Sequence, residues 1–375
     1  QRVGGVQRAR RLVEQHHVGL RRERARQGHP LGFATREVAC ISVEELRVEE
    51  SGTRPLVRTR STAATVDGAD VVGLAPATGE LRWSVQAGGD VDLIATSGAL
   101  IVSSGDSVRA VEEITGEERW QRDLGPGGGS TLLGAEEVVI TLDGGGDLIG
   151  LALAGGREVW RTPVERPRWW SVLHDVVGDT AVVASGSASP PVGGTREWLN
   201  GIDTGTGTVR WSRPMSGSSD RAVVAGDLVI DDAGLHAVAR EVRTGAVVWR
   251  FDTPGIRQVS PLTATTVLIA TTSAVTVGGM TLHALDSGTG AVLWTSEVPG
   301  VDISDPVVIG DTFVVGTSGD LPPTAAGTNG SITAGRLDDG STLWRTEVRD
   351  GVAARPVSTD GRIVALSADD PLFCD

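Results

Sequence analysis

Short apolar stretches alternate with turns rich in Gly and Asp from about residue 64 to residue 370. Residues 305–319, DPVVIGDTFVVGTSG, are typical, because two apolar runs flank one turn. A third short run follows, such as LHAL at 282–285, and then a Thr-Gly turn and a fourth run that contains a Trp. Apolar runs of this length between turn residues predict four short β-strands per unit. We therefore expect an all-β protein.

The unit repeats along the chain. A Thr-Gly-x-x-x-Trp motif, or a degenerate form of it, recurs every 37 to 51 residues, and it ends at Trp83, Trp120, Trp160, Trp211, Trp249, Trp294 and Trp344. A period of roughly 40–50 residues is typical of repeat architectures. Four antiparallel strands in a unit of this length predict a β-propeller blade. The seven copies therefore predict seven blades, and an eighth blade within residues 35–66 is the alternative.

The fixed Trp has a structural explanation. One four-stranded sheet cannot cover both of its own faces, so neighbouring blades must cover them. An indole offers a large apolar area and one N–H donor for a backbone carbonyl. The Thr-Gly turn before it reverses the chain, with Gly free to adopt positive φ. We predict that the seven motif Trp residues dock one blade against the next.

The two ends of the repeat region look incomplete. Residues 355–368 resemble the first two strands of a blade, and residues 70–83 resemble the last two. If these strands join, the N- and C-terminal strands share one blade and close the ring without exposed sheet edges.

Residues 1–60 differ from the region 61–375 that we assign to the propeller. They carry thirteen Arg and seven Glu, whereas the whole chain has a net charge of −14. They also lack a wide apolar helical face. We expect this segment to be disordered or a mis-assigned start, with binding to nucleic acid or membrane as the alternative.

Composition excludes several functions. The chain contains neither Lys nor Tyr, which rules out a P-loop or Schiff-base lysine and a tyrosine acid or base. The acidic body argues against general nucleic-acid binding. No run of about 18 apolar residues is present, so we expect no membrane span. The basic N-terminus is not followed by the apolar stretch of a signal peptide.

One copy of the repeat resembles a known family. Residues 284–294, ALDSGTGAVLW, fit the pattern Ala-x-Asp-x-x-Thr-Gly-x-x-x-Trp, which is similar to the tryptophan-docking motif of quinoprotein (PQQ-like) β-propellers. That family includes quinoprotein alcohol dehydrogenases, BamB-like assembly lipoproteins and sensor propellers of actinobacterial Ser/Thr kinases. The resemblance implies the fold, an envelope location and an actinobacterial source, but it says little about activity.

The enzymes of the family imply a cofactor site that this chain does not match. They hold a quinone against a disulfide between adjacent cysteines, with Ca²⁺ bound by Glu, Asn and Asp. Here the only cysteines are Cys40 and Cys374, and the only Asn residues are Asn200 and Asn329. Whether the two cysteines pair depends on how close the termini lie. We carry over no catalytic, cofactor or metal residue. We expect a non-catalytic binding or scaffold propeller, with a quinoprotein oxidoreductase as the alternative.

Departures from the repeat are the candidate binding features. Three insertions, at 185–198, 271–279 and 318–331, fall between the second and third strands of their units. Loops on a rigid scaffold often carry binding, so we expect a protein or a small polar ligand on the face that bears them, with drifted surface loops as the alternative. The candidate partner-binding residues are Arg168, Trp169, Trp170, Trp198 and Asn329. We expect the chain to be a monomer.

Overall fold

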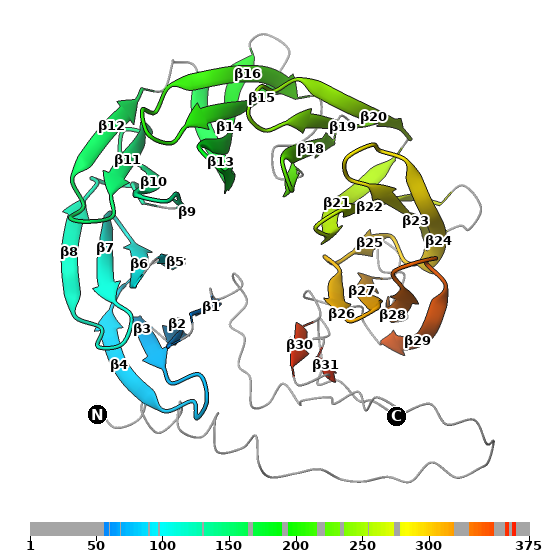
Figure 1. Ribbon diagram of the computed structural model, residues 1–375, viewed down its shortest axis with the longest axis horizontal. Helices are drawn as coiled ribbons and strands as arrows, with labels where there is room; N and C mark the ends of the chain where they lie inside the picture. Colours follow the sequence, from blue (N-terminus) through cyan, green and yellow to red (C-terminus); the bar gives the residue numbers. More distant parts are fainter. Residues whose placement is uncertain are drawn as a thin grey trace. The chain divides into compact units, whose positions relative to one another are not determined.

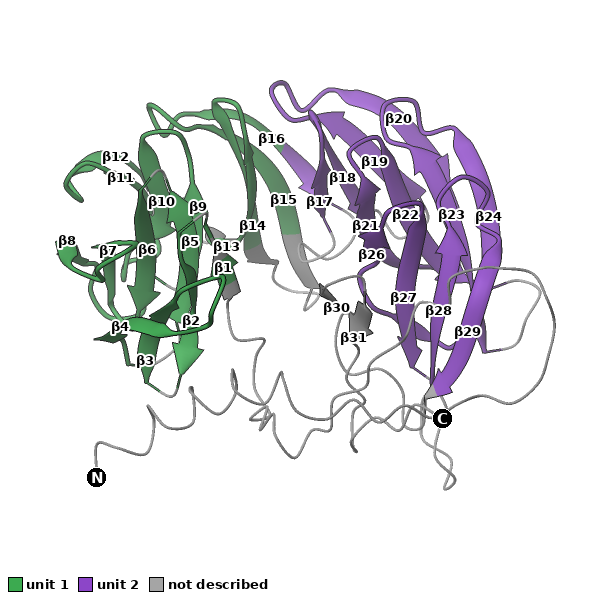
Figure 2. Ribbon diagram, turned by 60° about the horizontal axis from the view of Figure 1, so that its bottom comes forward, with its two compact units in different colours: residues 1–31, 49–212 green, residues 32–48, 213–375 purple. Residues whose placement is uncertain are grey.

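The computed structural model describes residues 56–348 with short gaps, together with residues 357–359 and 362–364. The gaps are 60, 68, 89–90, 97, 130, 164–167, 190–193, 216–221, 233–235, 254, 274–277 and 319–329. Every regular element among the described residues is a β-strand, as the hydrophobic pattern predicts. The chain divides into unit 1, residues 1–31 and 49–212, and unit 2, residues 32–48 and 213–375 (Figure 2).

Unit 1 contains four four-stranded antiparallel sheets (Figure 1). We call them blades A (β1–β4), B (β5–β8), C (β9–β12) and D (β13–β16), and the last strand of blade D runs across the unit boundary. Their strands are β1 Leu56–Arg58, β2 Ala63–Asp67, β3 Asp70–Leu74, β4 Leu81–Gln86, β5 Val91–Thr96, β6 Ala99–Ser104, β7 Ser107–Glu112, β8 Glu118–Asp123, β9 Leu132–Gly134, β10 Val138–Leu142, β11 Leu148–Ala152, β12 Glu158–Thr162, β13 Arg168–Val177, β14 Thr180–Ser189, β15 Gly194–Asp203 and β16 Val209–Met215.

Unit 2 contains blades E (β17–β20), F (β21–β24) and G (β25–β29), and a separate two-stranded sheet. In blade G, β25 and β26 both pair with β27 and together take the place of a first strand. The strands are β17 Val223–Ala225, β18 Leu228–Asp232, β19 His236–Glu241, β20 Val247–Asp252, β21 Ile256–Thr263, β22 Thr266–Thr272, β23 Gly279–Asp286, β24 Val292–Pro299, β25 Asp302–Ile303, β26 Val307–Ile309, β27 Thr312–Ser318, β28 Gly330–Arg336, β29 Thr342–Val348, β30 Val357–Thr359 and β31 Arg362–Val364.

The expectation that the chain ends share one blade is wrong for the described residues. Blade A takes all four strands from residues 56–86, because β1 and β2 pair in order with β3 and β4. The C-terminal strands β30 and β31 pair with each other in a two-stranded sheet of their own. The pattern concealed β1 because it is only three residues long, Leu-Val-Arg, and lies between Arg residues in the stretch assigned to the basic segment.

Each pair of successive blades within a unit encloses one apolar cluster. In unit 1 the clusters lie between blades A and B, B and C, and C and D. In unit 2 they lie between blades E and F, and F and G. The fully buried residues come mainly from the second and third strands, for example Ile101, Ile140 and Ile269. The core is therefore a series of interfaces between sheets.

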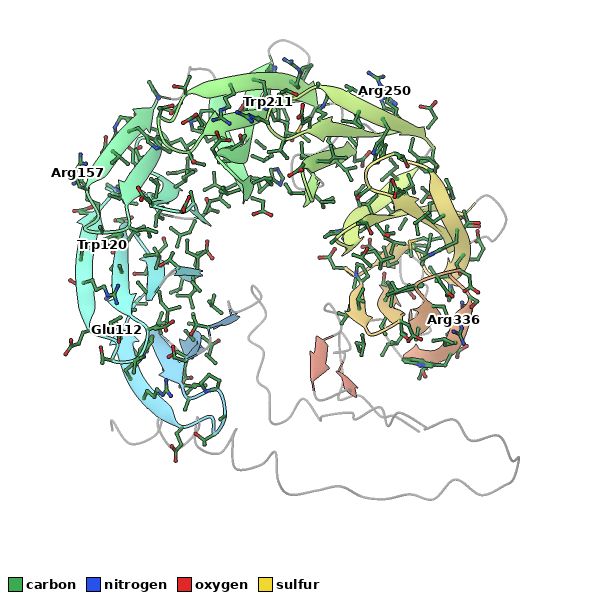
Figure 3. All side chains as sticks on the ribbon, viewed as in Figure 1. Glu112, Trp120, Arg157, Trp211, Arg250 and Arg336 are labelled. Atoms are coloured by element: carbon green, nitrogen blue, oxygen red, sulfur yellow. The ribbon has the colours of Figure 1, made fainter. Side chains whose placement is uncertain are left out.

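Five of the motif Trp residues bond to the following blade in the same unit. Their Nε1 atoms donate to backbone carbonyl oxygens at 2.7–3.0 Å, and the pairs are Trp83–Glu113, Trp120–Leu153, Trp160–Thr204, Trp249–Ser287 and Trp294–Leu337. Each acceptor is the first residue after the third strand of the next blade. Figure 3 labels Trp120 on β8. Trp211 on β16 is buried, and Trp344 on β29 is half-buried.

Small residues make room for these indoles on both sides. The third-strand residue opposite the Trp is Gly or Ala, for example Gly150 opposite Trp160 and Ala284 opposite Trp294. A Cβ built on Gly150 would lie 2.2 Å from Trp160 Cε2. On the other side, Gly207 in the turn of the next blade has φ of 71°, and a Cβ there would lie 2.5 Å from Trp160 Cε3. The turn Gly therefore serves twice, as a positive-φ residue and as the surface on which the preceding indole lies.

A β-bulge precedes the Trp in blades A, B, C, E, F and G. In blade E, Ala239 is opposite Trp249 but Arg240 is opposite Val247, so Val248 is the extra residue. The same shift occurs in blades A, B, C, F and G. The fourth strand is the outer edge of each sheet, and a bulge on an edge strand hinders pairing with another chain.

We predict that replacing a docked indole strongly destabilises the protein. Trp160→Ala should lower the free energy of unfolding by about 3–5 kcal/mol, as for other large-to-small core changes. Chemical denaturation followed by circular dichroism measures the change.

Two glycine variants test the same contact from the opposite side. Gly207→Ala places a methyl group against Trp160. The control is Gly178→Ala, because Gly178 has φ of 57° and a Cβ built on it has nothing within 4 Å. Both variants carry the backbone strain of positive φ, but only Gly207→Ala adds overpacking, which costs about 1–3 kcal/mol more. If the free energy of unfolding falls equally in Gly207→Ala and Gly178→Ala, the packing of Trp160 does not depend on the close approach of Gly207.

Candidate functional site

Blade D departs most from the other blades. Strands β13, β14 and β15 are each ten residues long, whereas the second and third strands of blades A–C have five or six residues. The three Trp residues outside the repeat motif, Trp169, Trp170 and Trp198, all lie on this longer sheet. We call the part formed by residues 168–172, 185–189 and 194–199 the blade D extension.

Strand register brings two of these Trp residues into one row. Trp170 on β13 is opposite Ser185 on β14, and Ser185 is opposite Trp198 on β15. Residues directly opposite each other in a sheet project from the same face. Trp170 and Trp198 therefore flank Ser185 on one face of the blade D extension, although 28 positions separate them in sequence.

A buried polar network supports this row. Asn200 Nδ2 donates to Ser185 Oγ and to the Val183 carbonyl, both at 3.0 Å, and to the Trp198 carbonyl at 3.2 Å. Asn200 and Ser185 are 2% and 3% exposed. A buried amide that is hydrogen-bonded in this way fixes the local strand geometry. Asn200 thus acts as a framework residue here, and its contacts orient the strand that carries Trp198.

The two indoles differ in their surroundings. Trp170 packs on the cluster between blades C and D, next to Leu173, and its buried Nε1 has no hydrogen-bond partner among the described residues. Trp198 is half-buried. The backbone of Trp169 pairs with that of Gly186 on β14. The backbone of Arg168 belongs to β13, but the side chains of Arg168 and Trp169 lie outside the described residues.

The three insertions occupy the predicted connection. They fall at the second-to-third strand connections of blades D, F and G, but residues 185–189 and 194–198 of the first insertion continue strands β14 and β15 instead of forming a loop. Residues 190–193, 274–277 and 319–329 within them, including Asn329, lie outside the described residues. The face that they share therefore stays a prediction. Cys40 and Cys374 also lie outside the described residues.

His283 on β23 belongs to the packing between blades E and F. His283 lies 3.1 Å from Thr271 Oγ1 through Nε2, and its ring meets Phe251 edge-on at 5.2 Å. Burial lowers the pKa of His283, although nearby Glu297 acts in the opposite direction. The part of the chain that the structure describes contains no group of three or more His, Cys, Asp or Glu residues that could hold a metal ion.

One buried carboxyl has unusual electrostatics. Asp231 on β18 is 1% exposed, and its Oδ1 lies 3.6 Å from Arg240 Nε on β19. Neither atom has a hydrogen-bond partner among the residues described. Burial raises the pKa of Asp231 to about 6, because removal from water disfavours the charged form, while the charge of Arg240 opposes this rise. Asp231 lies opposite Val238 on β19.

None of the described residues forms a helix with the length and apolar character needed to cross a membrane.

Comparison with known proteins finds a family match. The family model described as outer membrane protein assembly factor BamB matches residues 34–251 and 231–326. A curated protein of that name from Burkholderia pseudomallei is 29% identical over 192 residues, which are 46% of this chain and 48% of the relative. Another, from Alkalilimnicola ehrlichii, is 30% identical over 140 residues, or 36% of each chain. The chain thus spans about half or less of the length of these relatives.

Solved structures share the fold. BamB from Moraxella catarrhalis has a TM-score of 0.55 at 18% identity, and the match covers 84% of this chain and 93% of that one. Quinohemoprotein alcohol dehydrogenase ADHIIG from Pseudomonas putida HK5 has a TM-score of 0.55 at 13% identity, covering 82% and 68%. These likenesses confirm the predicted all-β propeller fold, the family match confirms its PQQ-like class, and seven sheets of four or five strands fit about seven blades. The actinobacterial source stays a prediction.

We predict that Asp231 makes stability depend on pH. Its folded pKa of about 6 lies above the ordinary value of 3.8. The stabilising contribution of the Asp231 carboxyl to the free energy of unfolding is therefore fully present below about pH 4 and is lost as pH rises through 6. Asp231→Asn removes this dependence. As pH rises from 4 to 8, the free energy of unfolding of Asp231→Asn should therefore increase by up to about 3 kcal/mol relative to that of wild type.

Urea denaturation of both proteins across this range measures the difference. Asp252→Asn, at an exposed carboxyl on the same blade, is the control for a change of charge alone. A difference between Asp231→Asn and wild type that stays constant with pH contradicts the prediction.

Proposed function

Because the chain belongs to the family of the outer membrane protein assembly factor BamB, we propose that it is a non-catalytic, envelope-associated scaffold that binds other proteins. The family match covers most of the propeller region, and the proteins that match in sequence carry the name of an assembly factor. By analogy with that name, the process it serves is the assembly of outer membrane proteins. The partner, the sensor role that the repeat also suggested and the envelope location are parts of this proposal.

The observation that carries the proposal is the row of Trp170, Ser185 and Trp198 on blade D. Repeat positions are committed to packing between blades, whereas the blade D extension adds Trp residues that the repeat does not require. Trp is enriched among the residues that dominate binding energy at protein interfaces. Trp198 is half-buried, and its backbone carbonyl accepts from the buried Asn200 amide, so a strand of fixed geometry carries a partly accessible indole. A pre-organised side chain loses little entropy on binding.

The arrangement of the described residues supports binding over catalysis. The groups whose pKa values shift toward the neutral form because of burial lie in different blades: Asp231 is in blade E, His283 is in blade F and Asp92 is in blade B. An acid–base site needs such groups together, within hydrogen-bond reach of one substrate. Asp92 is instead used between blades, because its Oδ2 accepts from the Leu132 N–H at 2.9 Å. The likeness to a quinohemoprotein dehydrogenase, at 13% identity, concerns the fold.

We predict that Trp198→Ala weakens partner binding at least tenfold. The tagged full chain is purified from the envelope of its source organism, and the proteins that accompany it are quantified by mass spectrometry. Loss of a buried aromatic anchor at an interface commonly costs about 2 kcal/mol or more.

The matched control is Val209→Ala, which truncates an exposed residue on β16 of the same blade. It should leave the accompanying proteins unchanged. Thermal denaturation of both variants separates lost binding from lost folding. An unchanged set of partners for Trp198→Ala at wild-type stability would place the binding surface elsewhere.

A second prediction separates the scaffold from an oxidoreductase. Adding pyrroloquinoline quinone and Ca²⁺ to the purified chain should give neither a bound quinone spectrum nor alcohol-dependent dye reduction. Absorbance after removal of free quinone is the measurement, and a known quinoprotein dehydrogenase treated in parallel is the positive control. A stoichiometric bound spectrum with dye reduction would falsify the non-catalytic assignment.

A further inference from the structure

We draw no further inference here: the strongest candidate, the surface around the half-buried Trp344 on the outer strand of blade G, is an apolar face suited to contact with another sheet, but nothing in the part of the chain that the structure describes shows what covers it.

Discussion

The rest of the structure depends on one contact, an indole enclosed between two small residues. The Trp of a fourth strand lies over a Gly or Ala of its own third strand and against the turn Gly of the next blade. Its N–H then reaches the carbonyl that follows the third strand of that blade. This single arrangement buries a large apolar side chain, satisfies its donor and sets how one sheet meets the next. Because it recurs, the spacing of the repeat is also the spacing of the interfaces between sheets.

This contact explains why so much of the fold could be predicted. The Trp positions, the four-strand units and the location of the three insertions follow from local pattern, because each strand is short and each turn has Gly or Asp. Strands that lack such a pattern were missed. β1 has three residues between Arg residues, and β1 and β2 form the first two strands of blade A, which were expected from the C-terminal region. The bulge was also hidden, because pairing partners rather than residue types define it.

The candidate site was less predictable, for a related reason. Trp170 and Trp198 are separate in sequence, and only the register through Ser185 places them in one row. Register depends on which residues of the three strands lie opposite one another. If one strand slips by two positions, its alternation of apolar and polar residues still matches the two faces of the sheet, so the sequence pattern alone does not fix the register. Asn200 was visible as a rare residue, but its role in fixing β15 required its three acceptors to be located. Asp231 likewise became unusual only when burial was known.

Repeat proteins are stabilised mainly by contacts between neighbours, so a change in one blade affects distant blades little. The described blades show the consequence. Blade D has long strands and additional Trp residues, blade E holds a buried Asp231–Arg240 pair, and the outer strands of E and F carry apolar runs where unit 1 carries charges. The indole N–H bonds of Trp249 in blade E and Trp294 in blade F are made beside these changes. A scaffold of this kind acquires separate surfaces independently, and that is the property required of a protein that holds several partners together.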